Sequence, residues 1–72
     1  MKEYLADKHL TNMEIKVIKL LAEGLSNKEI ADRLIISTST VKKYLESIYL
    51  KLSVHNRLQA VLYAIANDII TL

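Results

Sequence analysis

A chain of 72 residues suffices for one small domain, which buries only about 60% of the surface that its unfolded chain exposes. It has no cysteine, which excludes disulfides and thiolate zinc sites, and its 51% hydrophobic and 25% charged residues exclude a disordered chain. One glycine and no proline disfavour turn-rich all-β folds. We therefore expect an all-α fold in a cytoplasmic protein.

Positive charge is concentrated in the middle of the chain, although the net charge is only +2. Residues 26–57 carry six basic and three acidic side chains, whereas the rest of the chain carries four basic and five acidic ones. A local excess of this sign favours a polyanion as the binding partner.

Four helix starts are marked by N-cap residues. Two of them are capping boxes, in which a Ser or Thr is followed three residues later by a glutamate, here Glu14 and Glu29. The four N-caps are Thr11, Ser26, Ser37 and Asn56. Gly24 ends the first helix, because glycine enters the left-handed conformation without steric cost. The sequence predicts helices over about 12–23, 27–34, 38–52 and 57–67, with residues 1–9 as an N-terminal arm.

The second and third predicted helices are joined by a very short connection. Only Ile35 and Ile36 lie between the end of one helix and the N-cap of the next, which is the turn length of a helix-turn-helix. A short helix, a tight turn and a longer helix with basic residues are typical of DNA-binding modules.

The third predicted helix has an apolar stripe and a polar face. At about 100° per residue, the stripe consists of Val41, Leu45, Ile48 and Leu52. The opposite arc consists of Ser39, Lys42, Lys43, Glu46, Ser47 and Leu50. The helix N-terminus adds partial positive charge and free amides, so this face suits phosphate and base-edge contacts in a major groove.

The last predicted helix has two contrasting faces. The larger apolar residues are expected to cover the core, and these are Leu58, Val61, Leu62 and Ile65. The residues expected to point away from it are Gln59, Ala60, Tyr63, Ala66 and Asn67. Small residues around one tyrosine would admit a second helix in a two-fold dimer, but they are also compatible with a surface that contacts nothing.

Other classes of function find no support in the sequence. The longest uncharged apolar run, residues 60–66, is far shorter than the ~20 residues of a membrane helix. No serine belongs to a recognisable catalytic motif, and His9 and His55 have no ligand cluster near them. We expect no enzyme, no cofactor, no metal site, no membrane partner and no small-molecule ligand within this domain.

The order and spacing of these residues resemble one family. The similarity includes Leu10-Thr11 with Glu14, the run LAEGLSNKEIA at 21–31, and Thr40-Val41-Lys42. It extends over about residues 10–70, and the chain is similar to the LuxR-type, or GerE-type, helix-turn-helix domain. The resemblance implies a compact four-helix bacterial DNA-binding domain over 10–72 whose third helix enters the major groove of double-stranded DNA. Such domains usually form the output part of response regulators or quorum-sensing receptors, and some stand alone.

The resemblance also implies roles for individual residues. It assigns base contacts to Lys42 and Lys43. It assigns contacts with the phosphate backbone to Ser26, Asn27, Lys28, Ser37, Thr38, Ser39, Thr40 and Arg57. It implies a homodimer through the last helix, and therefore through Gln59, Ala60, Tyr63, Ala66 and Asn67.

Three positions depart from the family's pattern. Ser53 stands where glycine usually closes the third helix, so the turn there either costs energy or has another shape. Tyr44 replaces a common histidine. Glu46 lies where some members carry a base-contacting basic residue, and a carboxylate there would repel phosphate but could accept a hydrogen bond from cytosine.

A second interpretation keeps the fold but changes the partner. The low net charge and Glu46 are compatible with an interaction module that pairs with another regulator through the last helix and does not bind DNA itself.

Overall fold

The computed structural model describes residues 10–71, and within that range the chain forms four helices and no strand. They are α2 (Asn12–Ala22), α3 (Asn27–Leu34), α4 (Thr38–Leu52) and α5 (Arg57–Ala66). The two middle helices have the predicted bounds, and the outer two end one residue earlier than predicted. The all-α, four-helix prediction is confirmed. The predicted arm over residues 1–9 lies outside the described residues.

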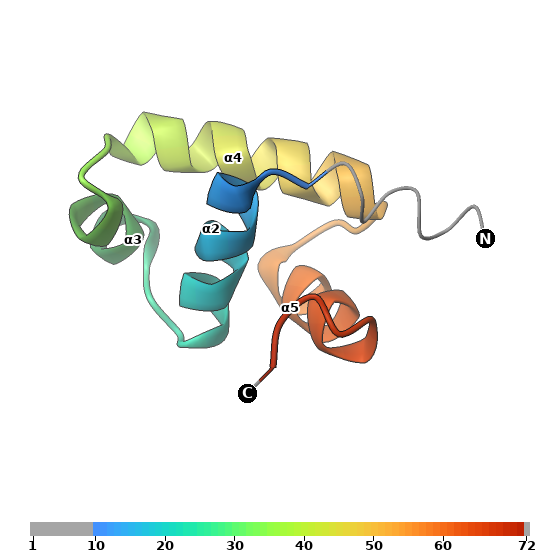
Figure 1. Ribbon diagram of the computed structural model, residues 1–72. Helices are drawn as coiled ribbons and strands as arrows, with labels where there is room; N and C mark the ends of the chain where they lie inside the picture. The colour runs from blue at the N-terminus through green and yellow to red at the C-terminus, as the bar shows by residue number, and fades with distance from the viewer. Residues whose placement is uncertain (1–9, 72) are drawn as a thin grey trace.

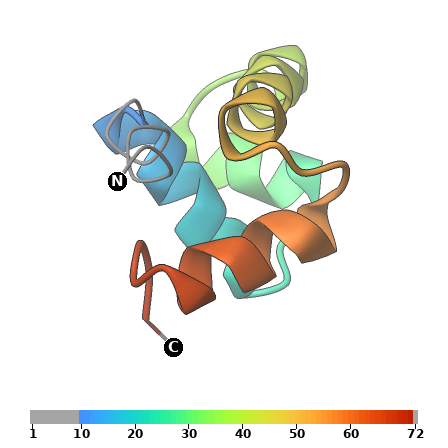
Figure 2. The same cartoon turned by 90° about the vertical axis from the view of Figure 1, so that its right-hand side faces the viewer.

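The longest helix, α4, lies across one side of the molecule. Figure 1 shows α4 along the top and α2 beneath it, with α3 at the left, where α4 begins, and α5 at the lower right. In the turned view of Figure 2, α2, α3 and α5 all lie on the same side of α4. α4 packs against each of these three helices, so one of its sides faces the core while the other faces outward.

The apolar stripe predicted for α4 is confirmed. Its four members are buried together with residues from the other helices and from the C-terminal segment. The buried apolar residues are Val17, Ile18, Leu20, Leu21, Ile30, Ala31, Val41, Leu45, Ile48, Leu52, Ala60, Ala64 and Ile70. Because the apolar residues recur at the 3.6-residue period of a helix, they lie on one face of α4. Burial of that face orients the remaining side chains of α4 toward solvent.

The predicted N-caps are confirmed. Both capping boxes are closed, with the hydroxyl of Thr11 accepting from the Glu14 amide at 3.1 Å and that of Ser26 accepting from the Glu29 amide at 3.1 Å. At the start of α5 the side chain of Gln59 accepts from the amide of His55 at 2.7 Å, one residue before the N-cap.

Each helix is followed by a residue in the left-handed conformation. The four φ angles are +88° at Gly24, +59° at Ile35, +57° at Ser53 and +58° at Asp68. The amides that follow these residues donate hydrogen bonds to carbonyl groups in the last turn of the preceding helix. The Leu25 amide, for example, donates to the Leu20 carbonyl at 3.3 Å, which is the Schellman pattern. Only the first of the four is a glycine, so the other three carry the steric cost of a Cβ in this region.

The core face predicted for the last helix is confirmed for Val61 and Ile65, which are half-buried and pack against the core, and is wrong for Leu58 and Leu62. Ala60 and Ala64 are fully buried, whereas Leu58 and Leu62 are 65% and 56% exposed. Small side chains on the inner face allow α5 to lie close to α2 and α4. The apolar residues of this helix are spread around it, and the prediction assumed that the larger ones are the buried ones.

Candidate nucleic-acid interface

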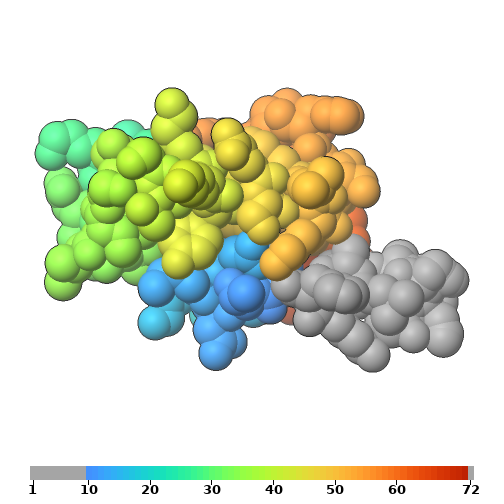
Figure 3. Space-filling model, turned by 90° about the horizontal axis from the view of Figure 1, so that it is seen from above, coloured from blue at the N-terminus to red at the C-terminus, as the bar shows by residue number. Residues whose placement is uncertain are grey.

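The outward side of α4 carries the residues predicted to read DNA. Ser39, Lys42, Lys43 and Glu46 are exposed, and Figure 3 looks directly onto the face that α4 dominates. Their predicted contacts with DNA stay a prediction, but the accessibility that such contacts require is present.

Ser47 is an exception on this predicted arc. It is half-buried, and its hydroxyl donates to the Glu14 carboxylate at 2.6 Å. Its side chain therefore faces α2 rather than open solvent, because α2 crosses beneath that side of α4.

The N-terminus of α4 is a cluster of hydroxyl groups. The Ser37 hydroxyl accepts from the Thr40 amide at 3.1 Å and lies 2.9 Å from the Thr40 hydroxyl and 3.2 Å from that of Ser39. Thr38 is exposed beside them. Hydroxyl donors next to a helix N-terminus suit a phosphate oxygen, because the helix dipole favours negative charge there.

The start of α3 presents a second polar set. Ser26 is exposed at its N-cap, where the bonds from its amide and hydroxyl hold the pKa of the Glu29 carboxyl below its ordinary value. The Lys28 ammonium lies 3.2 Å from the Asp32 carboxylate, and their side chains are 78% and 70% exposed. An exposed pair of this kind contributes at most about 0.5 kcal/mol, so a phosphate group can compete for the lysine.

Arg57 has a structural role that the sequence did not reveal. Its guanidinium donates to the Leu25 carbonyl at 3.1 Å and to the side-chain oxygen of Asn27 at 2.8 Å. These bonds connect the start of α5 to the start of α3. A guanidinium has five N–H donors, so the predicted phosphate contact by this exposed residue stays compatible with both bonds.

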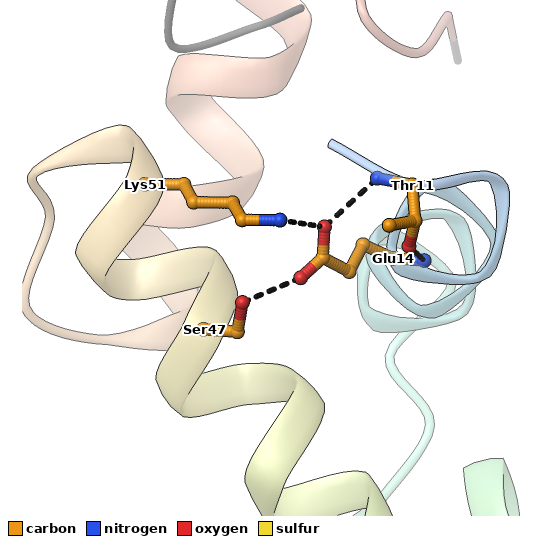
Figure 4. Close-up of polar contacts among 4 residues, drawn as sticks. All are labelled: Thr11, Glu14, Ser47 and Lys51. Carbon is orange, nitrogen blue, oxygen red and sulfur yellow. Dashed lines mark hydrogen bonds and ion pairs between the residues drawn. The ribbon is translucent and has the colours of Figure 1, made fainter. Parts of the chain in front are cut away.

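Glu14 is the main residue whose importance was missed. Its side chain is buried, and its carboxylate accepts from the Thr11 amide at 2.8 Å, the Lys51 ammonium at 2.8 Å and the Ser47 hydroxyl at 2.6 Å (Figure 4). Burial by itself raises the pKa of Glu14, but these hydrogen bonds and the lysine charge outweigh it and leave the pKa below its ordinary value. The only signal in the sequence was the capping box, which says nothing of α4.

The predicted dimer residues do not all share one surface. Gln59, Ala66 and Asn67 are exposed and Tyr63 is half-buried, but Ala60 is fully buried and its prediction as a dimer contact is wrong. The close approach of α5 to the core places this alanine inside. The exposed large apolar residues of α5 are instead the two leucines described above.

Two further classes of site find no support within residues 10–71. No group of three or more His, Cys, Asp or Glu side chains there could hold a metal ion. None of the four helices is long and apolar enough to cross a membrane.

The geometry agrees with comparisons to known proteins. Residues 8–64 match the family described as bacterial regulatory proteins, luxR family. The chain is 44% identical over 55 residues to the Fimbriae Z protein of Escherichia coli (strain K12), covering 76% of this chain and 26% of that protein. It is also 44% identical over 55 residues to the DNA-binding transcriptional activator DevR/DosR of Mycobacterium tuberculosis, covering 76% of this chain and 25% of that protein.

A solved structure has the same fold. The response regulator ChrA of a heme-sensing two-component system superposes with a TM-score of 0.83 at 43% identity, covering 85% of this chain and 30% of that one. The chain thus spans only between a quarter and a third of the length of the proteins named here. The second interpretation, an interaction module without DNA binding, is not favoured by these relatives. The chain belongs to the luxR family of bacterial regulatory proteins, as a DNA-binding helix-turn-helix domain.

Proposed function

We propose that this domain binds double-stranded DNA in a sequence-specific manner, with α4 in the major groove, as part of a bacterial transcriptional regulator. The observation that carries the proposal is the outward side of α4, where Lys42 and Lys43 are exposed next to the hydroxyl-lined N-terminus. Ammonium groups at this place can donate to the O6 and N7 acceptors of guanine, which are presented in that groove.

The remaining predicted residues hold the phosphate backbone in this proposal. The hydroxyl groups of Ser37, Thr38, Ser39 and Thr40 face one strand, and Ser26, Asn27 and Lys28 face it from the start of α3. Contacts of this type position the protein and carry no sequence information themselves. Arg57 adds a phosphate contact while its bonds to Leu25 and Asn27 keep the two helix starts in a fixed relation.

The domain acts as the output part of a longer regulator. The relatives are three to four times longer than the matched segment, and the superposed structure is named as a response regulator. A signal received elsewhere in such a protein would control access of α4 to DNA. Since its target is the bacterial chromosome, the domain works in the cytoplasm.

Two copies bind together on DNA through α5. Leu58 and Leu62 are exposed on one side of this helix, and Gln59 and Ala66 lie on the same exposed side. An isologous contact of one short helix buries little area, so dimerisation is weak without DNA. Two copies would contact half-sites about one helical turn apart.

A binding assay with a matched control tests the main proposal. A selected duplex is titrated with the wild-type domain, with a Lys42→Ala/Lys43→Ala variant and with a Lys16→Ala/Lys19→Ala variant, which loses the same charge from exposed positions on α2. We expect wild-type affinity to fall steeply between 50 and 200 mM salt, and only the first variant to lose preference for the selected duplex. Equal losses in both variants would assign the lysines of α4 a merely electrostatic role.

A further inference from the structure

We propose that Glu46 determines one position of the DNA half-site, by accepting a hydrogen bond from the exocyclic amino group of a cytosine in the major groove. The inference rests on the proposed function and extends it from the class of ligand to one base pair. Cytosine N4 and adenine N6 are the only hydrogen-bond donors that bases present in that groove, so they are the groups that a carboxylate can recognise.

The position of Glu46 on α4 places it among the predicted reading residues. It is exposed on the outward side, one helical turn after Lys42 and Lys43 and one turn before Leu50, which is 82% exposed. The outward side of α4 therefore changes from basic to acidic and apolar along its length. A carboxylate and a leucine add nothing to attraction for phosphate, so this half of the helix serves selectivity rather than general affinity.

The carboxylate of Glu46 is available for a ligand. Within residues 10–71 it has no hydrogen bond or ion pair, although Lys42 and Lys43 lie four and three residues before it, at spacings that permit pairing. Lys28 and Asp32 have the same four-residue spacing and do pair, at 3.2 Å. The ammonium groups of α4 and the carboxylate are thus separate groups that can engage different base pairs.

The chemistry of the base edges favours cytosine over adenine. Adenine N6 is flanked by the N7 acceptor of the same base, which repels the second oxygen of a carboxylate, whereas cytosine N4 is flanked by a C–H group. An approach to a phosphate would be repulsive, so a hydrogen bond to a base is the contact that offsets the cost of bringing Glu46 to a duplex. Lys43 and Glu46 are separated by roughly 4.5 Å along the helix axis. The two side chains can therefore contact different base pairs, with guanine expected at the lysine.

Selection of bound sequences from a random duplex pool tests the inference. The pool is offered to the wild-type domain, to Glu46→Ala, to Glu46→Gln and to Glu23→Gln, which removes an equal charge from an exposed position at the end of α2. We expect one cytosine in the wild-type half-site, loss of preference at that position alone in Glu46→Ala, and a shift to adenine in Glu46→Gln, because an amide pairs with adenine N6 and N7. Exchange of that C·G pair for T·A should weaken wild-type binding by about 5- to 100-fold and leave Glu46→Ala unaffected.

Two results would overturn the inference in distinguishable ways. If Glu46→Ala keeps the wild-type motif and binds every duplex more tightly by the same factor, the carboxylate only repels phosphate, and the proposed function survives without this contact. If the wild-type domain selects no sequence at all, the proposed function itself fails, and the assignment of Glu46 fails with it. Glu23→Gln should reproduce the wild-type motif, and a change in that variant would show that net charge alone alters the selection.

Discussion

The carboxylate of Glu14 and the ammonium of Lys51 lie 2.8 Å apart and join the first turn of α2 to the last turn of α4. The glutamate side chain is only 4% exposed and the lysine side chain is 28% exposed, so water screens the attraction between the two charges little at the glutamate. The same carboxylate closes the capping box of α2 through the Thr11 amide. The Glu14 side chain therefore caps the first turn of α2 and also fixes the orientation of α4, the helix proposed to read DNA.

Loss of this carboxylate should destabilise the domain. In Glu14→Ala the Lys51 ammonium, the Ser47 hydroxyl and the Thr11 amide all lose an acceptor. We expect the free energy of unfolding to fall by about 2–3 kcal/mol, less than for a fully buried pair because Lys51 is partly exposed. Urea denaturation measures this change, with Glu23→Ala at the exposed C-cap of α2 as the control, for which about 0.5 kcal/mol or less is expected. Equal losses in the two variants would contradict the role given to Glu14.

The stability of the domain should also depend on pH through the ionisation of Glu14. Its pKa in the folded chain lies below the ordinary value of 4.5, so the unfolded chain binds more protons between those two values. The stabilisation is present above the ordinary pKa and is lost as the pH falls through the folded one. Urea midpoints measured from neutral pH downward should fall in the wild-type domain, and the fall should be smaller in Glu14→Gln. A variant curve parallel to that of the wild type would contradict this assignment.

The turn between α3 and α4 should tolerate glycine better than the native residue. Ile35 has φ of +59° and is 89% exposed, so it carries the steric cost of a Cβ in the left-handed region without gaining burial. Ile35→Gly should raise the free energy of unfolding by about 1 kcal/mol, after allowance for the greater freedom of glycine in the unfolded chain. Thermal denaturation with Ile35→Ala as control checks it, because alanine keeps the Cβ and should bring little of this gain.

The lysines of α3 and α4 should differ in what they contribute to binding. Lys42→Ala should weaken binding to a matched duplex by about 1–3 kcal/mol and relax sequence choice. Lys28→Ala should weaken binding to matched and scrambled duplexes alike and reduce the salt slope by about one. Fluorescence anisotropy on both duplexes at several salt concentrations separates the two effects, and indistinguishable behaviour of the two variants would refute the division of roles.

The exposed leucines of α5 should matter for dimerisation and little for folding. Leu62 is 56% exposed, so Leu62→Glu should leave the helix content and unfolding midpoint close to those of the wild type. On a duplex with two half-sites, the variant should bind as independent monomers at about the affinity of a single half-site. Sedimentation of the complexes measures the stoichiometry, with Asn12→Glu at an exposed position of α2 as a control that adds the same charge. Cooperative binding by Leu62→Glu would place the dimer contact elsewhere.

Local features of the fold were accessible from the sequence because they act within one or two helical turns. The hydroxyl of Ser26 and the side chain of Glu29 close their capping box across three residues, and Gly24 ends α2 through its own backbone conformation. The apolar stripe on α4 could also be predicted from the sequence, because the opposite side of this helix holds mainly polar residues and only one apolar side is left to be buried. These signals also defined the helix-turn-helix spacing and the two exposed lysines.

Only the tertiary structure decided which side of α5 is inside and how α2 is joined to α4. Apolar residues lie all around α5, so periodicity cannot choose between faces, and the choice follows from how closely Ala60 and Ala64 allow the helix to approach its neighbours. Glu14 and Lys51 are 37 residues apart, and no local pattern connects two charges at that separation. Their meeting depends on the crossing of two helices, which packing of the whole core determines.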